Sequence, residues 1–198
     1  VSYNTITSAV VSGYTFHIGG ILKAYFDGQP AGSITSVINN NTITLNSANV
    51  SGYMEGIYNQ NLTALSTATF TMNNNTIANC VINGVGTTSG FIGIGNNSAS
   101  GTLNISNNII RGNTSSSTVG GFDGIINFVA VITTININNN KIGDAIAGAI
   151  IFSAATTAPI TAITNWDATA TATINLNNNS IQGISCVSSG VFAGIMNL

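Results

Sequence analysis

The stretch that decides the fold is Thr173-Ile174-Asn175-Leu176-Asn177-Asn178-Asn179-Ser180-Ile181, because a version of it occurs six times along the 198 residues. The closing isoleucine marks each copy, and successive anchors are 37, 34, 33, 32 and 39 residues apart: Ile6, Ile43, Ile77, Ile110, Ile142 and Ile181. Repeats of this length are typical of solenoids, in which each repeat stacks on its neighbours.

Apolar residues alternate with polar ones ahead of each anchor, at the two-residue period of a β-strand. One apolar column lies five residues before the anchor: Val1, Ile38, Met72, Ile105, Ile137 and Leu176. A second lies two residues further back, as Phe70, Leu103, Ile135 and Ile174, with Ser36 in its place in the second copy. These columns predict one buried strand face in each copy.

Two asparagine columns separate this strand from the anchor. The first column lies three residues before the anchor; it is Tyr3 in the first copy and asparagine in the other five. Asparagine tolerates the left-handed conformation of a tight corner, and its amide can bond to an equivalent amide one strand spacing away. We therefore predict a structural asparagine ladder, formed by the residue two before each anchor: Asn4, Asn41, Asn75, Asn108, Asn140 and Asn179.

A glycine-punctuated segment follows each anchor, and we interpret it as the third strand of the coil. In the fifth copy it is interpreted as shortened to Ala147-Gly148-Ala149-Ile150. The longest loop is expected from Ser153 to Ala172, around Trp166, and a second around Asp27 and Pro30; solenoids carry inserted function in such loops. The aromatic residues near the start of the segment are expected to stack in the core: Tyr14, Tyr53, Phe91 and Phe122.

The composition excludes several classes of function. Hydrophobic residues make up 44% and charged residues 4% of the chain, with a net charge of −2, so disorder through charge repulsion is not expected. Three Lys and Arg residues cannot neutralise a run of phosphates, so we predict no nucleic-acid partner. No apolar stretch of about 18 residues and no basic leader is present, which predicts neither a membrane span nor a signal peptide.

The strings Val37-Ile38-Asn39-Asn40-Asn41-Thr42-Ile43 and Gly56-Ile57-Tyr58-Asn59 resemble the right-handed parallel β-helix repeats of the pectin-lyase-like superfamily, particularly those of large bacterial surface and adhesin proteins. The resemblance covers the whole chain. It implies an all-β, right-handed parallel β-helix of about six coils with Asn ladders and no capping helix, and residues 1–198 are expected to form one such solenoid. Because the superfamily includes polysaccharide lyases, hydrolases, autotransporter passengers and stalks, the resemblance implies no single activity.

Few residues offer catalytic chemistry. Glu55 and Asp123 each precede a closing glycine, and stacking would place them roughly 10 Å apart, near the upper limit for an inverting carboxylate pair. Ile92 fills the same column in the coil between them, so we interpret both as solvated surface acids. Since the lone His17 supports neither a metal site nor a triad, we predict no catalytic, cofactor-binding or metal-binding residue.

Five further side chains receive structural interpretations. Arg111 and Asp144 fall one position apart in adjacent coils and are expected to form a surface ion pair, with Lys141 as a solvated side chain. Cys80 and Cys186 lie three coils apart, roughly 14 Å at strand spacing, which exceeds disulfide reach. Both are expected to be buried, free thiols.

The expected function is structural, in an extracellular surface, stalk or fibre component with adhesive loops. A carbohydrate-active enzyme is the alternative from another class. A lesser alternative is ice binding, motivated by the rows Thr69/Thr71, Thr102/Asn104, Thr134/Asn136 and Thr173/Asn175. A bacterial origin is expected, because glycans at the sequons of Asn40, Asn74 and Asn178 would disrupt the corner.

The first and last repeats of the sequence indicate what the solenoid binds at its ends. Neither shows a helix or polar atypical repeat that would cover the apolar cross-section of a solenoid. We expect head-to-tail self-association or continuation in a longer chain, with a glycan or other surface ligand as a further partner and no cofactor.

Overall fold

The computed structural model describes residues 1–8, 11–12, 18–25, 34–48, 52–61, 65–83, 90–146 and 149–198. Within these ranges the chain forms 23 strands. It forms no helix there, so none that is long and apolar enough to cross a membrane. Several residues singled out above lie outside the described ranges: Tyr14, His17, Asp27, Pro30, Ala147 and Gly148.

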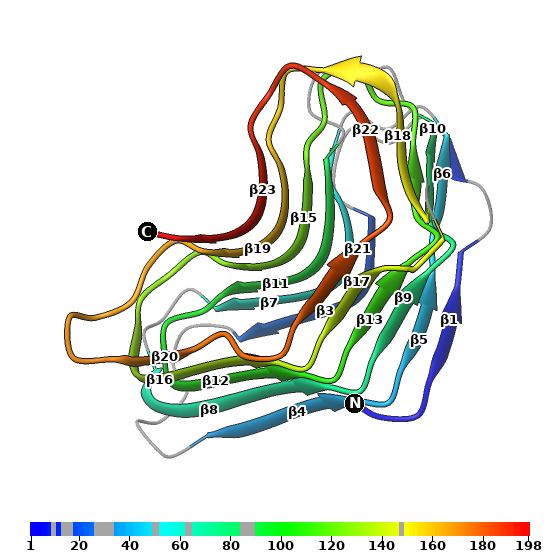
Figure 1. Cartoon of the computed structure of the whole chain (residues 1–198). Coiled ribbons are helices and arrows are strands. Elements are labelled where there is room, and N and C mark those ends of the chain that lie inside the picture. The colour runs from blue at the N-terminus through cyan, green and yellow to red at the C-terminus, as the bar shows by residue number, and fades with distance from the viewer. Residues whose placement is uncertain are drawn as a thin grey trace.

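Each coil contributes strands to four parallel sheets, which form the walls of a solenoid (Figure 1). Sheet A, the strand ahead of the asparagine corner, contains β4 (Thr35–Asn39), β8 (Leu65–Asn73), β12 (Ser100–Ser106), β16 (Val131–Asn138) and β20 (Thr173–Asn175). Sheet B, which holds the anchors, contains β1 (Thr5–Thr7), β5 (Thr42–Thr44), β9 (Thr76–Ala78), β13 (Ile109–Arg111), β17 (Lys141–Gly143) and β21 (Ser180–Gln182).

The other two walls complete the coil. Sheet C contains β2 (Val11–Ser12), β6 (Asn46–Ala48), β10 (Val81–Asn83), β14 (Thr114–Ser115), β18 (Ile150–Thr156) and β22 (Ile184–Ser188). Sheet D contains β3 (Ile18–Tyr25), β7 (Met54–Asn61), β11 (Phe91–Asn97), β15 (Phe122–Asn127), β19 (Ile160–Asn165) and β23 (Phe192–Asn197). The fold is therefore an all-β parallel solenoid, as predicted.

The solenoid has about five coils, slightly fewer than the six predicted. Sheet A has five strands whereas sheets B, C and D have six, because the first copy contributes no sheet A strand. The six anchors thus bound five full coils.

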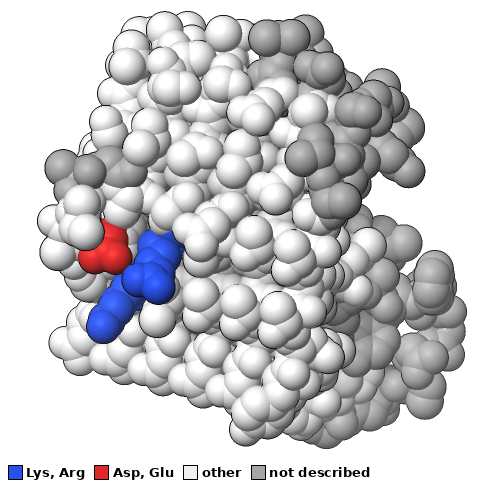
Figure 2. Space-filling model, turned by 90° about the vertical axis from the view of Figure 1, so that its right-hand side faces the viewer, with Lys and Arg blue, Asp and Glu red and all other residues white. Residues whose placement is uncertain are grey.

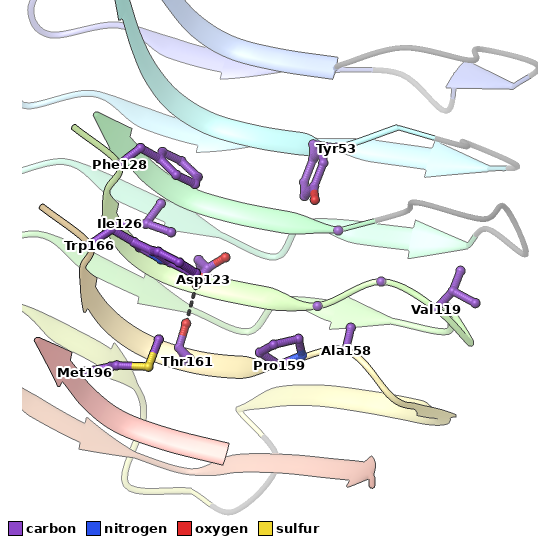
Figure 3. Close-up of a pocket in the computed structure, with 13 residues that line it drawn as sticks. Tyr53, Val119, Asp123, Ile126, Phe128, Ala158, Pro159, Thr161, Trp166 and Met196 are labelled. Atoms are coloured by element: carbon purple, nitrogen blue, oxygen red, sulfur yellow. Dashed lines mark hydrogen bonds between the residues drawn. The ribbon is translucent and has the colours of Figure 1, made fainter. Parts of the chain in front are cut away.

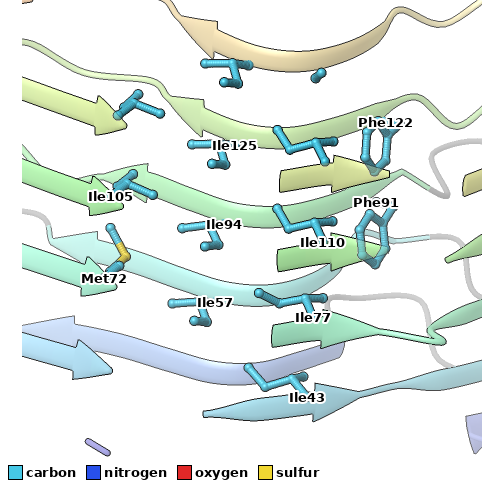
Figure 4. Close-up of a cluster of buried hydrophobic side chains, with 14 of the residues drawn as sticks. Ile43, Ile57, Met72, Ile77, Phe91, Ile94, Ile105, Ile110, Phe122 and Ile125 are labelled. Atoms are coloured by element: carbon cyan, nitrogen blue, oxygen red, sulfur yellow. The ribbon is translucent and has the colours of Figure 1, made fainter. Parts of the chain in front are cut away.

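The predicted columns are confirmed by the strand register. The anchors pair in sequence through sheet B. In sheet A, Phe70, Leu103 and Ile135 align as predicted, and each is at most 1% exposed. Figure 4 shows the anchors facing a matching isoleucine column of sheet D, with the apolar residues of sheet A beside them. The repeat therefore builds one continuous apolar core.

The closing glycines hold sheet D close to the anchors. A Cβ atom at Gly93 would lie 2.5 Å from the carbonyl oxygen of Gly124 and 2.7 Å from Cδ1 of Ile110. Gly56 has an equivalent contact with Ile77. A side chain at either position would press against the anchor and the next strand, so close packing favours glycine in these coils. The fifth coil places Ala162 there.

Three segment assignments from the sequence are wrong. The glycine-punctuated segment is the fourth strand of the coil, because the short strands of sheet C precede it. The stretch from Ser153 to Ala172 is not one loop, since β18 runs to Thr156 and Ile160–Asn165 forms β19. Only residues 157–159 and 166–172 of this stretch are irregular. The fifth copy's segment is thus β19 and not residues 147–150, and Ala162 in place of glycine concealed it.

The aromatic stack is also shorter than predicted. Phe91 and Phe122 stack with ring centroids 5.7 Å apart and an interplanar angle of 6°, and Phe152 packs edge-on against Phe122. Tyr53 lies outside this stack, because Met54 is the residue that pairs with Phe91. The Tyr53 side chain is 41% exposed instead.

Candidate functional site

The predicted asparagine ladder runs along the corner between sheets A and B. At each step the backbone N–H and the side-chain Nδ2 of one asparagine donate to Oδ1 of the next, at 2.9 and 3.1 Å from Asn75 to Asn108. The Nδ2 group of Asn108 also donates to the carbonyl oxygen of Met72 at 2.8 Å. The four central members, Asn41, Asn75, Asn108 and Asn140, are at most 1% exposed. Their side-chain hydrogen-bonding capacity is satisfied without water.

The residue before each ladder asparagine makes the corner itself. Its φ lies between 55° and 59° in every copy, as predicted for the left-handed conformation: Tyr3, Asn40, Asn74, Asn107, Asn139 and Asn178. The two asparagines of the pair therefore have different tasks, since the first turns the chain and the second bonds along the axis.

A second buried ladder, not predicted above, ends the strands of sheet D. Side-chain amides of adjacent coils are joined by hydrogen bonds of 2.6 to 2.8 Å: Asn59, Asn96, Asn127, Asn165 and Asn197. The sequence carries its signal, because an asparagine follows two residues after every Gly-Ile or Ala-Ile pair of this sheet from Gly56-Ile57 onward.

A third, partly exposed row lies on the outer face of sheet A, on the surface considered for ice binding. Asn175 donates to Asn136, and Asn136 to Asn104, both at 2.8 Å. These amides are therefore engaged with one another along the axis.

A cavity of about 330 Å³ opens on the outer face of sheet D (Figure 3). Its polar centre is the carboxyl group of Asp123 on β15. Thr161 on β19 donates a hydrogen bond to Oδ1 of this carboxyl group, and Thr164 donates to the same oxygen at 3.5 Å. Burial raises the pKa of Asp123 above its ordinary value, and the two hydroxyl donors only partly offset this effect.

Aromatic side chains surround this carboxyl group. Figure 3 shows the Trp166 indole directed toward Asp123, Phe128 above it and Tyr53 on the opposite side. Trp166 is 53% exposed, but its backbone is held by the second ladder. The backbone N–H of Trp166 donates to the carbonyl oxygen of Asn127 at 2.9 Å, and Nδ2 of Asn127 donates to the carbonyl oxygen of Asp167 at 2.9 Å. The ladder thus positions an exposed aromatic ring.

The structure corrects the interpretation of the two acids. Glu55 and Asp123 do share a column, with Ile92 pairing with both, as the spacing predicted. They are not fully solvated, since Glu55 is 3% exposed and Asp123 is partly buried. Only Asp123 lines the cavity, so the geometry does not assemble a carboxylate pair there.

The predicted ion pair is confirmed. Arg111 Nη1 lies 3.4 Å from Asp144 Oδ2, and both side chains are well exposed. They border a shallow hollow of about 240 Å³ together with Lys141. Figure 2 shows this small charged cluster on a face whose other described residues are uncharged. Within the described ranges, no three His, Cys, Asp or Glu side chains come together to hold a metal ion.

Both cysteines are free, as predicted. Cys80 is buried, and burial raises its pKa from 9.0 to about 11, while the backbone N–H of Leu45 donates to its sulfur at 3.3 Å. Cys186 is only partly buried, which corrects the expectation of two buried thiols.

The last coil leaves part of its interior uncovered. Phe192 and Ile195 of β23 pair with Ile160 and Ile163 of β19, which are both fully buried. Phe192 is nevertheless 55% exposed and Ile195 47% exposed. This coil forms the near end of the solenoid in Figure 1, where β20 to β23 lie uncovered.

Strand register and stacking place the chain in the class of parallel β-solenoid proteins. Comparisons with protein-family models, curated proteins and solved structures find no match. The class therefore rests on the geometry described above.

Proposed function

We propose that the protein is a structural solenoid of an extracellular surface, stalk or fibre, extended at its open end by a further coil. That coil belongs either to a second copy stacked head to tail or to a longer chain. The observation that carries the proposal is the exposure of Phe192 and Ile195, whose columns are buried in earlier coils. Because both side chains are already about half buried, covering the rest contributes about 1 kcal/mol each.

The ladder supports a head-to-tail arrangement because it has a direction. Each ladder asparagine donates toward the following coil. Among the described residues, no group accepts from the backbone N–H of Asn179, and none donates to Oδ1 of Asn4. The unpaired donor at one end therefore matches the unpaired acceptor at the other. Contacts of this heterologous kind produce open filaments.

The surface chemistry favours assembly and a bacterial surface. Only eight Asp, Glu, Lys and Arg side chains are present, so little charge repulsion opposes stacking. Two of the sequons lie at buried asparagines, Asn96 and Asn113, which are at most 3% exposed. Glycans there would break the packing, which supports an origin in a cell that does not glycosylate these positions. Exposed loops are the proposed place for adhesive contacts.

Sedimentation and negative-stain imaging of a protein comprising residues 1–198 test the stacking. Rods one solenoid wide are expected. Ile195→Lys, which places a charge on the open end, should shorten or abolish them. Ile132→Lys makes the same change at a position 36% exposed on β16, which lies between β12 and β20 and away from both ends of its sheet, and should not. A stable, monodisperse monomer at micromolar concentration would overturn head-to-tail stacking.

The longer-chain arrangement has its own test. Intact mass and terminal sequencing of the protein from its natural source would show additional coils fused to residues 1–198. A natural chain of 198 residues that stays monomeric would refute both arrangements.

A carbohydrate-active enzyme is the second proposal, favoured by one observation. Asp123 is a carboxylic acid with a raised pKa, lying in a cavity beside aromatic rings. Plant and algal polysaccharides should then yield reducing ends or unsaturated products, and Asp123→Asn should abolish them. The absence of product would end this proposal.

Ice binding through the outer face of sheet A is a lesser proposal. It is supported by the regular spacing of the threonine column and weakened by the mutual hydrogen bonds of Asn104, Asn136 and Asn175. Thermal hysteresis and reshaping of ice crystals are the expected readouts, and their absence would refute it.

A further inference from the structure

The cavity on sheet D combines one acid with several aromatic rings. Its side-chain polar groups are the Asp123 carboxyl, the Thr161 hydroxyl, the Tyr53 phenol and the Trp166 indole N–H. The remaining lining consists of apolar side chains and backbone, and no lining residue is basic. The cavity therefore presents an acid and aromatic faces without an internal counter-charge.

One oxygen of the acid is available to a ligand. Both hydrogen bonds from Thr161 and Thr164 go to Oδ1 of Asp123, and no described residue donates to Oδ2. Figure 3 shows the Thr161 bond on one side of the carboxyl group, with the other oxygen directed toward the Tyr53 side of the cavity. The basic side chains that the structure describes, Arg111 and Lys141, border a different hollow next to sheet B. A buried carboxylate of this kind is stabilised most by a cation that brings its own charge.

The rings favour a cation that also has an apolar surface. A cation near the face of Trp or Tyr is attracted by the ring quadrupole, and tryptophan is the best of the aromatic residues in this role. The backbone of Trp166 is held at the rim, because its N–H donates to the carbonyl oxygen of Asn127 and Nδ2 of Asn127 donates to the carbonyl oxygen of Asp167. A sugar needs several donors and acceptors, whereas the Thr161 hydroxyl is already committed to Asp123.

We propose that this cavity binds an organic cation, an alkylammonium or quaternary ammonium group of the size of a choline head or a lysine side-chain end. The carboxylate of Asp123 faces the positive charge, and the rings of Trp166 and Tyr53 contact its methyl or methylene groups. The volume of about 330 Å³ suits one such small ligand. The site lies on the side wall, so it exists in a monomer and in a filament alike and does not rest on the proposed assembly.

The chain contains one tryptophan, so intrinsic fluorescence reports directly on Trp166. Titration of residues 1–198 with choline should change this emission with a Kd of about 1 mM or tighter. The neutral isostere 3,3-dimethylbutan-1-ol has the same shape without the charge and should bind at least about tenfold more weakly. Calorimetry provides an independent measurement of both affinities.

Matched variants locate the site. Asp123→Asn should weaken choline binding at least about tenfold, because the amide keeps the acceptor for Thr161 but removes the charge. Asp144→Asn makes the same charge change at the other hollow, beside Arg111 and Lys141, and should leave binding unchanged. Trp166→Leu, followed by calorimetry, should weaken binding about three- to thirtyfold. Thermal unfolding verifies that each variant is folded.

Three results would overturn the proposal. The first is no change in fluorescence or heat with choline, and the second is equal binding of the neutral isostere. The third is binding of a neutral sugar such as methyl glucoside where choline does not bind, which would make the cavity a saccharide site. Since the comparison of choline with its isostere uses the unaltered protein, it decides the question even if a variant fails to fold.

Discussion

Replacing Asn108 by alanine removes the middle of the buried asparagine ladder, and we expect it to be severely destabilising. The side chain of Asn108 accepts from the backbone N–H and Nδ2 of Asn75, and it donates to Oδ1 of Asn140 at 3.0 Å and to the Met72 carbonyl at 2.8 Å. Four hydrogen bonds at about 1 kcal/mol each give about 4 kcal/mol. The buried N–H of Asn75, left without an acceptor, adds about 1 kcal/mol or more.

The matched control is Asn136→Ala, which changes the same residue type one coil later on the outer face of sheet A. Asn136 loses two amide bonds of 2.8 Å, but it is only partly buried, so water replaces them and the expected loss is at most about 1 kcal/mol. Urea unfolding followed by circular dichroism at one protein concentration measures both. Midpoint and slope are compared, because solenoids can unfold in parts. A difference below about 1 kcal/mol between the variants would refute the assignment of the ladder as a principal source of stability.

Three further outcomes are expected. Gly93→Ala should lower the free energy of unfolding by about 1–3 kcal/mol, because its Cβ would lie 2.5 Å from a carbonyl oxygen of the next coil. Gly19→Ala, whose Cβ would have its nearest neighbour 3.9 Å away, should leave thermal unfolding unchanged. Equal losses of stability in the two variants would contradict this. Alkylation of the native protein at pH 8, read by peptide mass spectrometry, should modify Cys186 well before Cys80, whose pKa is about 11, and equal rates would be inconsistent with its burial. Because folding raises the pKa of Asp123, its contribution to stability is fully present below pH 3.8 and is lost as the pH rises through the folded-state pKa. At pH 7 the Asp123→Asn variant should therefore be more stable than the parent protein. The difference in their free energies of unfolding should shrink on acidification and should not widen.

The repeat was readable from the sequence where one residue type occupies a column in every coil. Isoleucine at the anchor and asparagine two residues earlier have no exceptions, so period, register and ladder could all be predicted. Sheet C could not be predicted, because three different residue types occupy the buried position directly before its strands: Leu45, Cys80 and Asn113. Its strands are also as short as two residues, too short to show a period.

The cavity was only partly predictable. Asp123 stood out as an acid before a closing glycine, but its burial depends on covering of the outer face of sheet D, which no local pattern encodes. Trp166 and Tyr53 reach it from segments far apart in the chain. The sequence predicts a long loop around Trp166, whereas Asn165 directly before it ends a strand and belongs to a buried ladder. The proposed cation site therefore consists of side chains that the repeat itself does not specify.

The asparagine ladder keeps the rise from one coil to the next constant, whatever the number of residues in the coil. Spacings between anchors vary from 32 to 39 residues, yet the backbone bond from each ladder asparagine to the next stays between 2.9 and 3.1 Å. Extra residues are accommodated at the side and do not shift the next coil. The length of such a solenoid is therefore set by its number of coils, at about 4.8 Å each. A peptide grafted into a side loop would lie at a fixed position along the axis and would not change the length of the solenoid.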